Sequence, residues 1–168
     1  MPRIFSILAF GCTLALTPLA VLAQAQGAQV AFGSMKGDPT LPVEVTSDQL
    51  NVNQADGTAI FTGAVLVVQG EMRMTAERVQ VFYAEDGKKI SRMHATGGVT
   101  LTNGGEAAEG QEAVYTIDTG GVVMTGDVLL TQGSSAISGK KLTVDLNTGT
   151  GVMEGRVQTV FVPATAGQ

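Results

Sequence analysis

Apolar and polar residues alternate along most of the chain after residue 42. The apolar residues two positions apart are Leu50/Val52, Val65/Val67, Val79/Val81, Val99/Leu101, Tyr115/Ile117, Val128/Leu130 and Leu142/Val144. A period of two, in segments rich in Val and Thr, is the pattern of a half-buried β-strand. No amphipathic helical pattern follows residue 25. The pattern therefore predicts an all-β domain over residues 43–162.

Seven turn signals divide this domain into eight runs of about a dozen residues. They are Asp56-Gly57, Gln69-Gly70, Asp86-Gly87, Asn103-Gly104, Thr119-Gly120-Gly121, Gln132-Gly133 and Asn147-Thr148-Gly149. Glycine accepts the positive φ that tight hairpin turns require, and asparagine and aspartate are favoured beside it. We therefore expect successive runs to pair as antiparallel hairpins.

The domain also contains an internal repeat. Its key glycines, Gly63, Gly97, Gly126 and Gly155, are separated by 34, 29 and 29 residues. A second series of small residues, Ser47, Ala76, Gly110 and Gly139, is separated by 29, 34 and 29 residues. The two series agree on a period of 29 with about five extra residues near 85–89, which indicates a stack of similar units.

Each run carries one of these small residues near its middle. A flat strand of twelve residues would extend about 40 Å, which is longer than most strands. Glycine inside a strand marks a bend or a bulge. If every run bends there, the stack forms two facing walls with an apolar groove between them. The sequence thus predicts an open, bent antiparallel β jelly roll, or a short antiparallel solenoid, with free edges at both ends.

The first 23 residues have the pattern of a secretory signal peptide. Arg3 precedes an apolar run over residues 4–22, and small residues permit cleavage after Ala23 or Ala25. An uncleaved membrane anchor is the alternative interpretation, because the run is long enough to span a bilayer. Cys12 lies in this segment, so the mature chain would have no cysteine. Residues 24–42 are predicted to be a flexible leader, and residues 163–168 a flexible tail.

Charge and residue chemistry narrow the function classes. The formal net charge is −5, with 10 Lys and Arg against 15 Asp and Glu, which argues against nucleic-acid binding. His94 is the one imidazole and occupies a repeat position held elsewhere by Ile60, Val123 and Val152. No Gly-x-Ser-x-Gly nucleophile motif is present, and the carboxylates are scattered. We expect no enzyme activity, no metal site and no cofactor.

The inward apolar residues admit two interpretations. They form either a packed β core or a groove for lipid. The small number of aromatic residues, and a bent stack that does not close by itself, favour the groove.

Several segments resemble the OstA-like lipopolysaccharide-transport family. They are residues 62–70, 76–81, 123–132, 137–142 and 159–163, within a region of resemblance over 43–162. The resemblance implies a bent β jelly roll that holds the acyl chains of lipid A and pairs head to tail with like-folded domains. It implies neither catalysis nor a cofactor. A stand-alone domain behind a cleavable signal peptide is similar to the family's periplasmic bridging component. The inner-membrane component would keep its N-terminal helix, and the outer-membrane component would continue into a barrel.

The resemblance places Val43, Val45, Tyr115 and Ile117 at the entrance of the groove. The other lipid-binding candidates are the inward apolar residues Leu50, Val52, Phe61, Val65, Val67, Val79, Val81, Val99, Leu101, Val128, Leu142 and Val144. The expected partners are lipopolysaccharide, the inner- and outer-membrane transport proteins of the same fold, and further copies of this chain, all in the periplasm.

The first and last strands, expected at 43–52 and 152–162, are poorly protected edges. The last has no charged residue after Arg156 and no proline before Pro163, although natural edge strands are usually guarded by charge or proline. The partner-binding candidates on these edges are Val43, Glu44, Val45, Val157, Thr159 and Phe161. The alternative functions are a structural or adhesive β-solenoid module with a packed interior, and the inner-membrane-anchored component of the same transport system.

Overall fold

The computed structural model describes residues 28–31, 35–85 and 87–161, and this part consists of strands and turns without a helix. The strands are β1 (Ala28–Ala31), β2 (Glu44–Thr46), β3 (Gln49–Asn53), β4 (Thr58–Gln69), β5 (Met72–Tyr83), β6 (Ile90–Asn103), β7 (Glu106–Thr116), β8 (Gly121–Gln132), β9 (Ser135–Asp145), β10 (Thr150–Glu154) and β11 (Gln158–Val160). The predicted signal peptide and the C-terminal tail lie outside the described residues.

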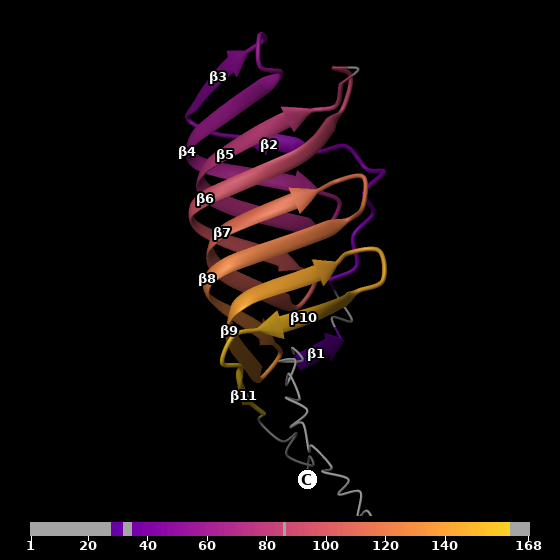
Figure 1. The fold of residues 1–168 in the computed structure, drawn as a ribbon, viewed down its shortest axis with the longest axis vertical. Coiled ribbons are helices and arrows are strands. Elements are labelled where there is room, and N and C mark those ends of the chain that lie inside the picture. The colour runs from indigo at the N-terminus through magenta and orange to yellow at the C-terminus, as the bar shows by residue number, and fades with distance from the viewer. Residues whose placement is uncertain (1–27, 32–34, 86, 162–168) are drawn as a thin grey trace, which may run out of the picture.

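All the strands belong to one antiparallel sheet. Its order is β1-β10-β9-β8-β7-β6-β5-β4-β2, with β3 also paired to β4 and β11 also paired to β9. From β4 to β10, strands that follow one another in the sequence are neighbours in the sheet, so hairpin turns connect them (Figure 1). The predicted all-β antiparallel fold is confirmed.

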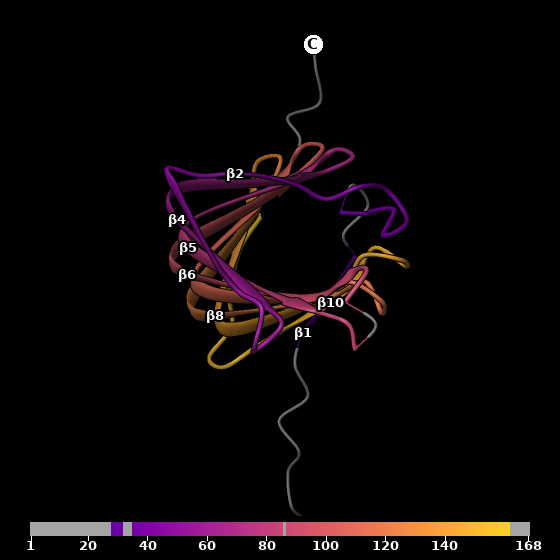
Figure 2. The ribbon, with the colours of Figure 1, turned by 90° about the horizontal axis from the view of Figure 1, so that it is seen from above.

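The long strands bend in the middle. The pairing register shifts between Thr62 and Val65 in β4, and at the corresponding place in the pairs that join β5 to β9. The bends lie on one side of the molecule, and Figure 2 shows the sheet folded there into two walls. The predicted bent jelly roll is therefore confirmed. We call the wall that contains β3 and β10 the first wall, and the wall that contains β2 and β11 the second wall.

The bend explains the sequence repeat. At Gly97, φ is +88°, and an added Cβ would lie 2.7 Å from the Cβ of Glu77 on the neighbouring strand. Gly63, Gly126 and Gly155 stand in the same relation to Asp48, Gln111 and Lys140. The repeated glycine gives the backbone its left-handed turn and makes room for the side chain that crosses the corner. The contacting residues each directly follow a member of the second series, Ser47, Ala76, Gly110 and Gly139, so both series in the sequence mark the corners.

The predicted turns also appear. The turn glycines with positive φ are Gly57, Gly70, Gly87, Gly104, Gly120, Gly133 and Gly149. The half-strands of each wall end at these turns, opposite the bends, so the turns of the two walls face each other along one open side. We call this open side the seam.

Two expectations about the ends are wrong. Part of the segment predicted as a flexible leader is structured: β1 pairs with β10, and residues 35–42 contact both walls. The last edge, expected as one strand over 152–162, is divided between β10 and β11, which pair with opposite halves of β9 because the chain bends at Gly155. Consequently β10 is not a free edge, whereas β2, β3 and β11 lie at the ends of the roll.

Candidate functional site

The space between the walls is lined by apolar side chains from alternate positions of every long strand. Eleven of the predicted lipid-binding residues lie there with at most 8% exposure: Val65, Val67, Val79, Val81, Val99, Leu101, Tyr115, Ile117, Val128, Leu142 and Val144. Val43, Val45 and Phe61 are half-buried at the rim of this interior. The pattern of alternation therefore identified the inward face of the sheet.

Leu50 and Val52 differ from that expectation, because their side chains are 56% and 57% exposed. In the register of the sheet they lie opposite Phe61 and Ala59, on the inward face. Their strand, β3, is at the end of the roll, where no further strand covers it (Figure 1). These two residues therefore belong to an exposed end surface instead of the enclosed interior.

Sequence reasoning missed the methionines of the interior. Met35, Met72, Met74, Met93, Met124 and Met153 are all at most 2% exposed. Met72 and Met74 continue the period of two and were visible in the sequence. Met35 carried no such signal, because it precedes the first regular strand of the repeat. Methionine is unbranched and flexible, so these side chains can adapt to irregular space.

A buried hydrogen bond crosses the interior between the walls. The Tyr115 hydroxyl of the first wall donates to Gln69 Oε1 of the second wall over 2.8 Å. Burial raises the pKa of Tyr115 from 10.0 to about 12, because the apolar surroundings disfavour the phenolate. A neutral, buried polar pair thus links the two walls in addition to the strands that run through the bends.

Polar side chains collect at the seam on the turns of the second wall. Gln69, Asn103 and Glu106 are at most 9% exposed. Glu106 Oε1 accepts a bond of 2.8 Å from Gln132 Nε2, while Asn103 Oδ1 and Glu106 Oε2 have no hydrogen-bond partner. Buried polar atoms without partners are uncommon in folded proteins. The seam is therefore the polar border of an otherwise apolar interior.

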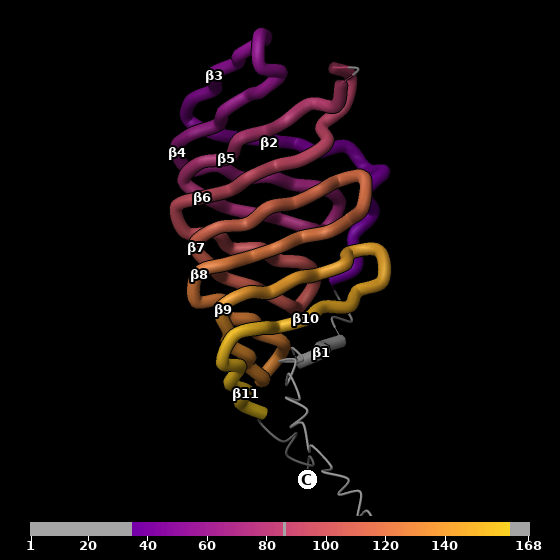
Figure 3. The backbone as a smooth tube through the Cα atoms, in the orientation of Figure 1, coloured from indigo at the N-terminus to yellow at the C-terminus, as the bar shows by residue number. Residues whose placement is uncertain are grey.

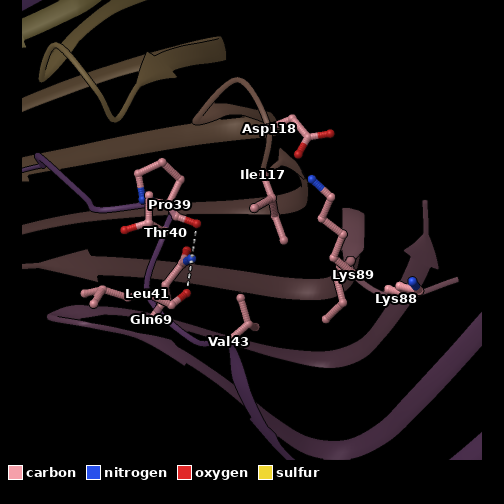
Figure 4. A pocket seen from close by; sticks show the side chains of 10 residues that line it. Pro39, Thr40, Leu41, Val43, Gln69, Lys88, Lys89, Ile117 and Asp118 are labelled. Atoms are coloured by element: carbon pink, nitrogen blue, oxygen red, sulfur yellow. Dashed lines mark hydrogen bonds between the residues drawn. The ribbon is translucent and has the colours of Figure 1, made fainter. Parts of the chain in front are cut away.

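A pocket of about 560 Å³ opens at the seam near β2 (Figure 4). This volume lies within the range of pockets that hold small organic ligands. Its lining residues are Pro39, Thr40, Leu41, Val43, Gln69, Lys88, Lys89, Ile90, Ile117 and Asp118. Apolar and polar side chains line it together, and Lys88, Lys89 and Asp118 place charges of both signs among them.

The partner-binding candidates lie at the two ends of the roll. Val43, Val45 and Val157 are half-buried, whereas Glu44, Thr159 and Phe161 are exposed. Val160 and Phe161 at one end are 62% and 75% exposed. Together with Leu50 and Val52 at the other end, they make both ends of the roll apolar.

The remaining candidate chemistry lies outside the interior. His94 is on the outer face of the first wall, between the inward residues Met93 and Ala95, and bonds to Glu112. Over the residues that the structure describes, no three metal-ligating side chains gather into a group. Nor does this part of the chain contain a helix long and apolar enough to cross a membrane.

Comparison with known proteins agrees with this architecture. Residues 44–150 match the model of the family described as "LptA/(LptD N-terminal domain) LPS transport protein". An uncharacterized protein of Rhizobium meliloti (strain 1021) is 30% identical over 121 residues. That match covers 68% of this chain, and the chain spans 64% of the length of this curated relative.

A solved structure shares the fold. It is LptH from Pseudomonas aeruginosa, described as the LptA homologous periplasmic component of the conserved lipopolysaccharide transport device. The TM-score is 0.68 at 19% identity, and the match covers 76% of this chain and 99% of LptH. The predicted resemblance to the OstA-like family is confirmed, since the family model matches more than half of the chain. The protein belongs to the lipopolysaccharide-transport family of LptA and the N-terminal domain of LptD.

Proposed function

We propose that this protein binds lipopolysaccharide in the periplasm, holds the acyl chains of lipid A between its two walls, and bridges inner- and outer-membrane transport proteins of the same fold. The observation that carries the proposal is the open construction of the fold. The walls are joined by the sheet at the bends, while an apolar interior faces the seam. Acyl chains can therefore enter from the side without breaking the strand pairing.

The lining of the interior suits a hydrocarbon ligand. Over the described residues, the buried side chains are apolar except for Thr58, Gln69, Asn103 and Glu106. Burial of apolar surface contributes about 25 cal/mol per Å², so each methylene group moved from water into this space adds about 0.8 kcal/mol. The six buried methionines allow the interior to repack around chains of different length.

The ends of the roll support assembly into a bridge. Exposed β2 and β3 at one end and β11 at the other carry backbone groups that an added strand would pair. Leu50, Val52, Val160 and Phe161 would bury their apolar surface in such a contact. A head-to-tail contact of this kind repeats along an axis, so copies of this chain and like-folded domains would form a continuous channel.

One observation favours a second candidate function, a structural or adhesive β-solenoid module. Most side chains of the interior are at most 2% exposed in the described structure. A packed core of this kind needs no ligand. The two functions differ in whether lipid occupies the interior of the purified protein.

Native mass spectrometry of the periplasmic protein tests the proposal, with two matched variants in β2. Val45→Asp puts a charge on the inward face, where the side chain is half-buried, whereas Thr46→Asp puts the same charge on the outward, exposed side of the same edge strand. We expect bound lipopolysaccharide in the wild type and in Thr46→Asp, and its loss in Val45→Asp. A wild-type protein that folds and never carries lipid after incubation with lipopolysaccharide contradicts the proposal and favours the packed module.

A further inference from the structure

The seam of the roll is crossed by a short segment of the chain itself. Residues 35–42, which we call the strap, connect the region of β1, beside β10 at one end of the sheet, to β2 at the other end. Figures 2 and 3 show the strap running along the open side, between the turns of the two walls. It lies where a ligand entering from the side would have to pass.

Backbone groups of the strap bind both walls. The Gly37 N–H donates to the Leu146 carbonyl of the first wall over 3.0 Å. From the second wall, Asn103 Nδ2 donates to the Lys36 carbonyl over 2.9 Å. Gln69 Nε2 donates to the Pro39 and Leu41 carbonyls over 3.2 and 2.9 Å. The strap therefore joins the edges of the two walls across the seam.

One strap side chain also enters the interior. Met35 is fully buried and belongs to the same apolar cluster as Val67, Leu101 and Leu146. The strap thus occupies the hydrocarbon space as well as the seam. Acyl chains that enter at this level must displace Met35.

The amides that hold the strap are themselves almost fully buried, with Gln69 3% and Asn103 1% exposed. A buried amide donor without an acceptor is destabilising, so these donors need another acceptor whenever the strap leaves. Ester and amide carbonyls of an acylated ligand are acceptors of the same kind as the strap carbonyls. Asn103 Oδ1 has no hydrogen-bond partner, so the strap does not supply hydrogen bonds to all the buried polar atoms of the seam.

We propose that the strap is an internal occupant of the seam, which an acylated ligand displaces when it enters between the walls. This inference rests on the proposed lipid-binding function, and it adds that the strap and the ligand compete for the seam. The empty protein is closed by residues 35–42, and the loaded protein has these residues released from Leu146, Gln69 and Asn103. The affinity for ligand is then reduced by the free energy that holds the strap in place.

A reversible disulfide between the strap and the first wall tests this competition. A Cβ added at Gly37 would lie 3.6 Å from the Cβ of Leu146, within the usual separation of about 3.5–4.5 Å for disulfide-bonded cysteines. Cys12, the one native cysteine, precedes the described residues and lies in the predicted signal peptide. The full-length mature protein with Gly37→Cys and Leu146→Cys therefore forms a single defined bridge.

Binding of purified lipopolysaccharide is compared for the oxidised double variant, the same protein after reduction, and the wild type. We expect the reduced form to bind and the oxidised form to bind at least tenfold more weakly. Equal binding by a fully oxidised and a reduced sample overturns the strap inference and leaves lipid binding intact. Failure of the wild type to bind contradicts the proposed function, so the two failures are distinguishable.

Hydrogen exchange of the wild type gives a second measurement, which does not depend on the folding of a variant. Addition of lipopolysaccharide should speed exchange in a peptide covering residues 35–42, because the Gly37 N–H loses its acceptor, the Leu146 carbonyl. Exchange in β5 to β8 should not increase. Bound lipopolysaccharide with unchanged or slower exchange in the strap would contradict the inference.

Discussion

Replacing Tyr115 with phenylalanine tests how the two walls are held together. The substitution removes the hydroxyl that donates to Gln69 Oε1, in an interior where Tyr115 is 2% exposed. Leaving a buried acceptor unpaired costs about 1–3 kcal/mol. At pH 7 we therefore expect the free energy of unfolding of Tyr115→Phe to be lower than that of the wild type by about 1–2 kcal/mol.

The same substitution has a second effect at high pH. The pKa of Tyr115 is raised from 10.0 to about 12 in the folded protein. Between these values the unfolded chain has lost the phenolic proton and the folded protein still holds it. The wild type therefore loses stability as the pH rises, by about 1.4 kcal/mol per pH unit. Tyr115→Phe lacks this loss, so the stabilities of the two proteins should converge near pH 11.

Urea unfolding followed by circular dichroism at pH 7, 9, 10 and 11 measures both effects. Tyr83→Phe is the matched control, because its side chain is 39% exposed, and it should change the unfolding free energy by less than about 0.5 kcal/mol at pH 7. If Tyr115→Phe keeps a constant difference from the wild type up to pH 11, the hydroxyl does not titrate as a buried group. The account of the cross-wall bond would then be wrong.

Three further substitutions, one of them with a matched control, test the corners and the edge. Gly97→Ala should lower the unfolding free energy by about 2 kcal/mol or more, because φ is +88° and the new Cβ would meet Glu77, whereas the control Gly105→Ala adds a Cβ with nothing within 4 Å and should change it little. Thermal unfolding measures both variants, and equal effects would contradict the proposed role of the corner glycine. Ala64 has φ +42° at the position that Gly98 occupies in the next repeat, so Ala64→Gly should raise the unfolding free energy by about 0.5–1 kcal/mol. Urea titration measures this change, and a loss of stability would show that the Ala64 backbone is unstrained. Thr159→Pro should prevent end-to-end association while the monomer stays folded, because β11 is an exposed edge strand. Light scattering at increasing concentration measures the association, and a wild type that stays monomeric and binds no domain of the same fold would refute the prediction.

The corners and the inward face could be predicted because local rules determine them. Gly63 and Gly97 are required by a left-handed backbone and by a side chain that crosses the corner, and both constraints recur with the repeat. Val79 and Val81 are buried because a strand with a period of two has one covered face. These relations depend on neighbours in the sheet, and hairpin connections make those neighbours adjacent in the sequence.

The strap and the ends of the roll could not be predicted in the same way. Met35 is buried because a segment outside the repeat returns along the seam, and this contact joins residues far apart in the sequence. Leu50 lies on the inward face of its strand and is nonetheless exposed, because no further strand beyond β3 covers this end of the roll. The sequence indicates Asn103 only as a turn residue, and the role of its side-chain amide in holding the strap depends on that same distant segment.

Site-specific crosslinking gives the most direct test of the central claim that acyl chains lie between the walls. Phe61 faces inward and is half-buried at the rim, opposite Val79, whereas Phe82 lies on the outer face of the same wall beneath Arg92. Each is replaced in turn by photoreactive benzoyl-phenylalanine, which resembles phenylalanine in shape, and the protein is irradiated with lipopolysaccharide. The account predicts a lipopolysaccharide adduct at position 61 and none at position 82. Equal crosslinking at both positions, or crosslinking at position 82 alone, would contradict it.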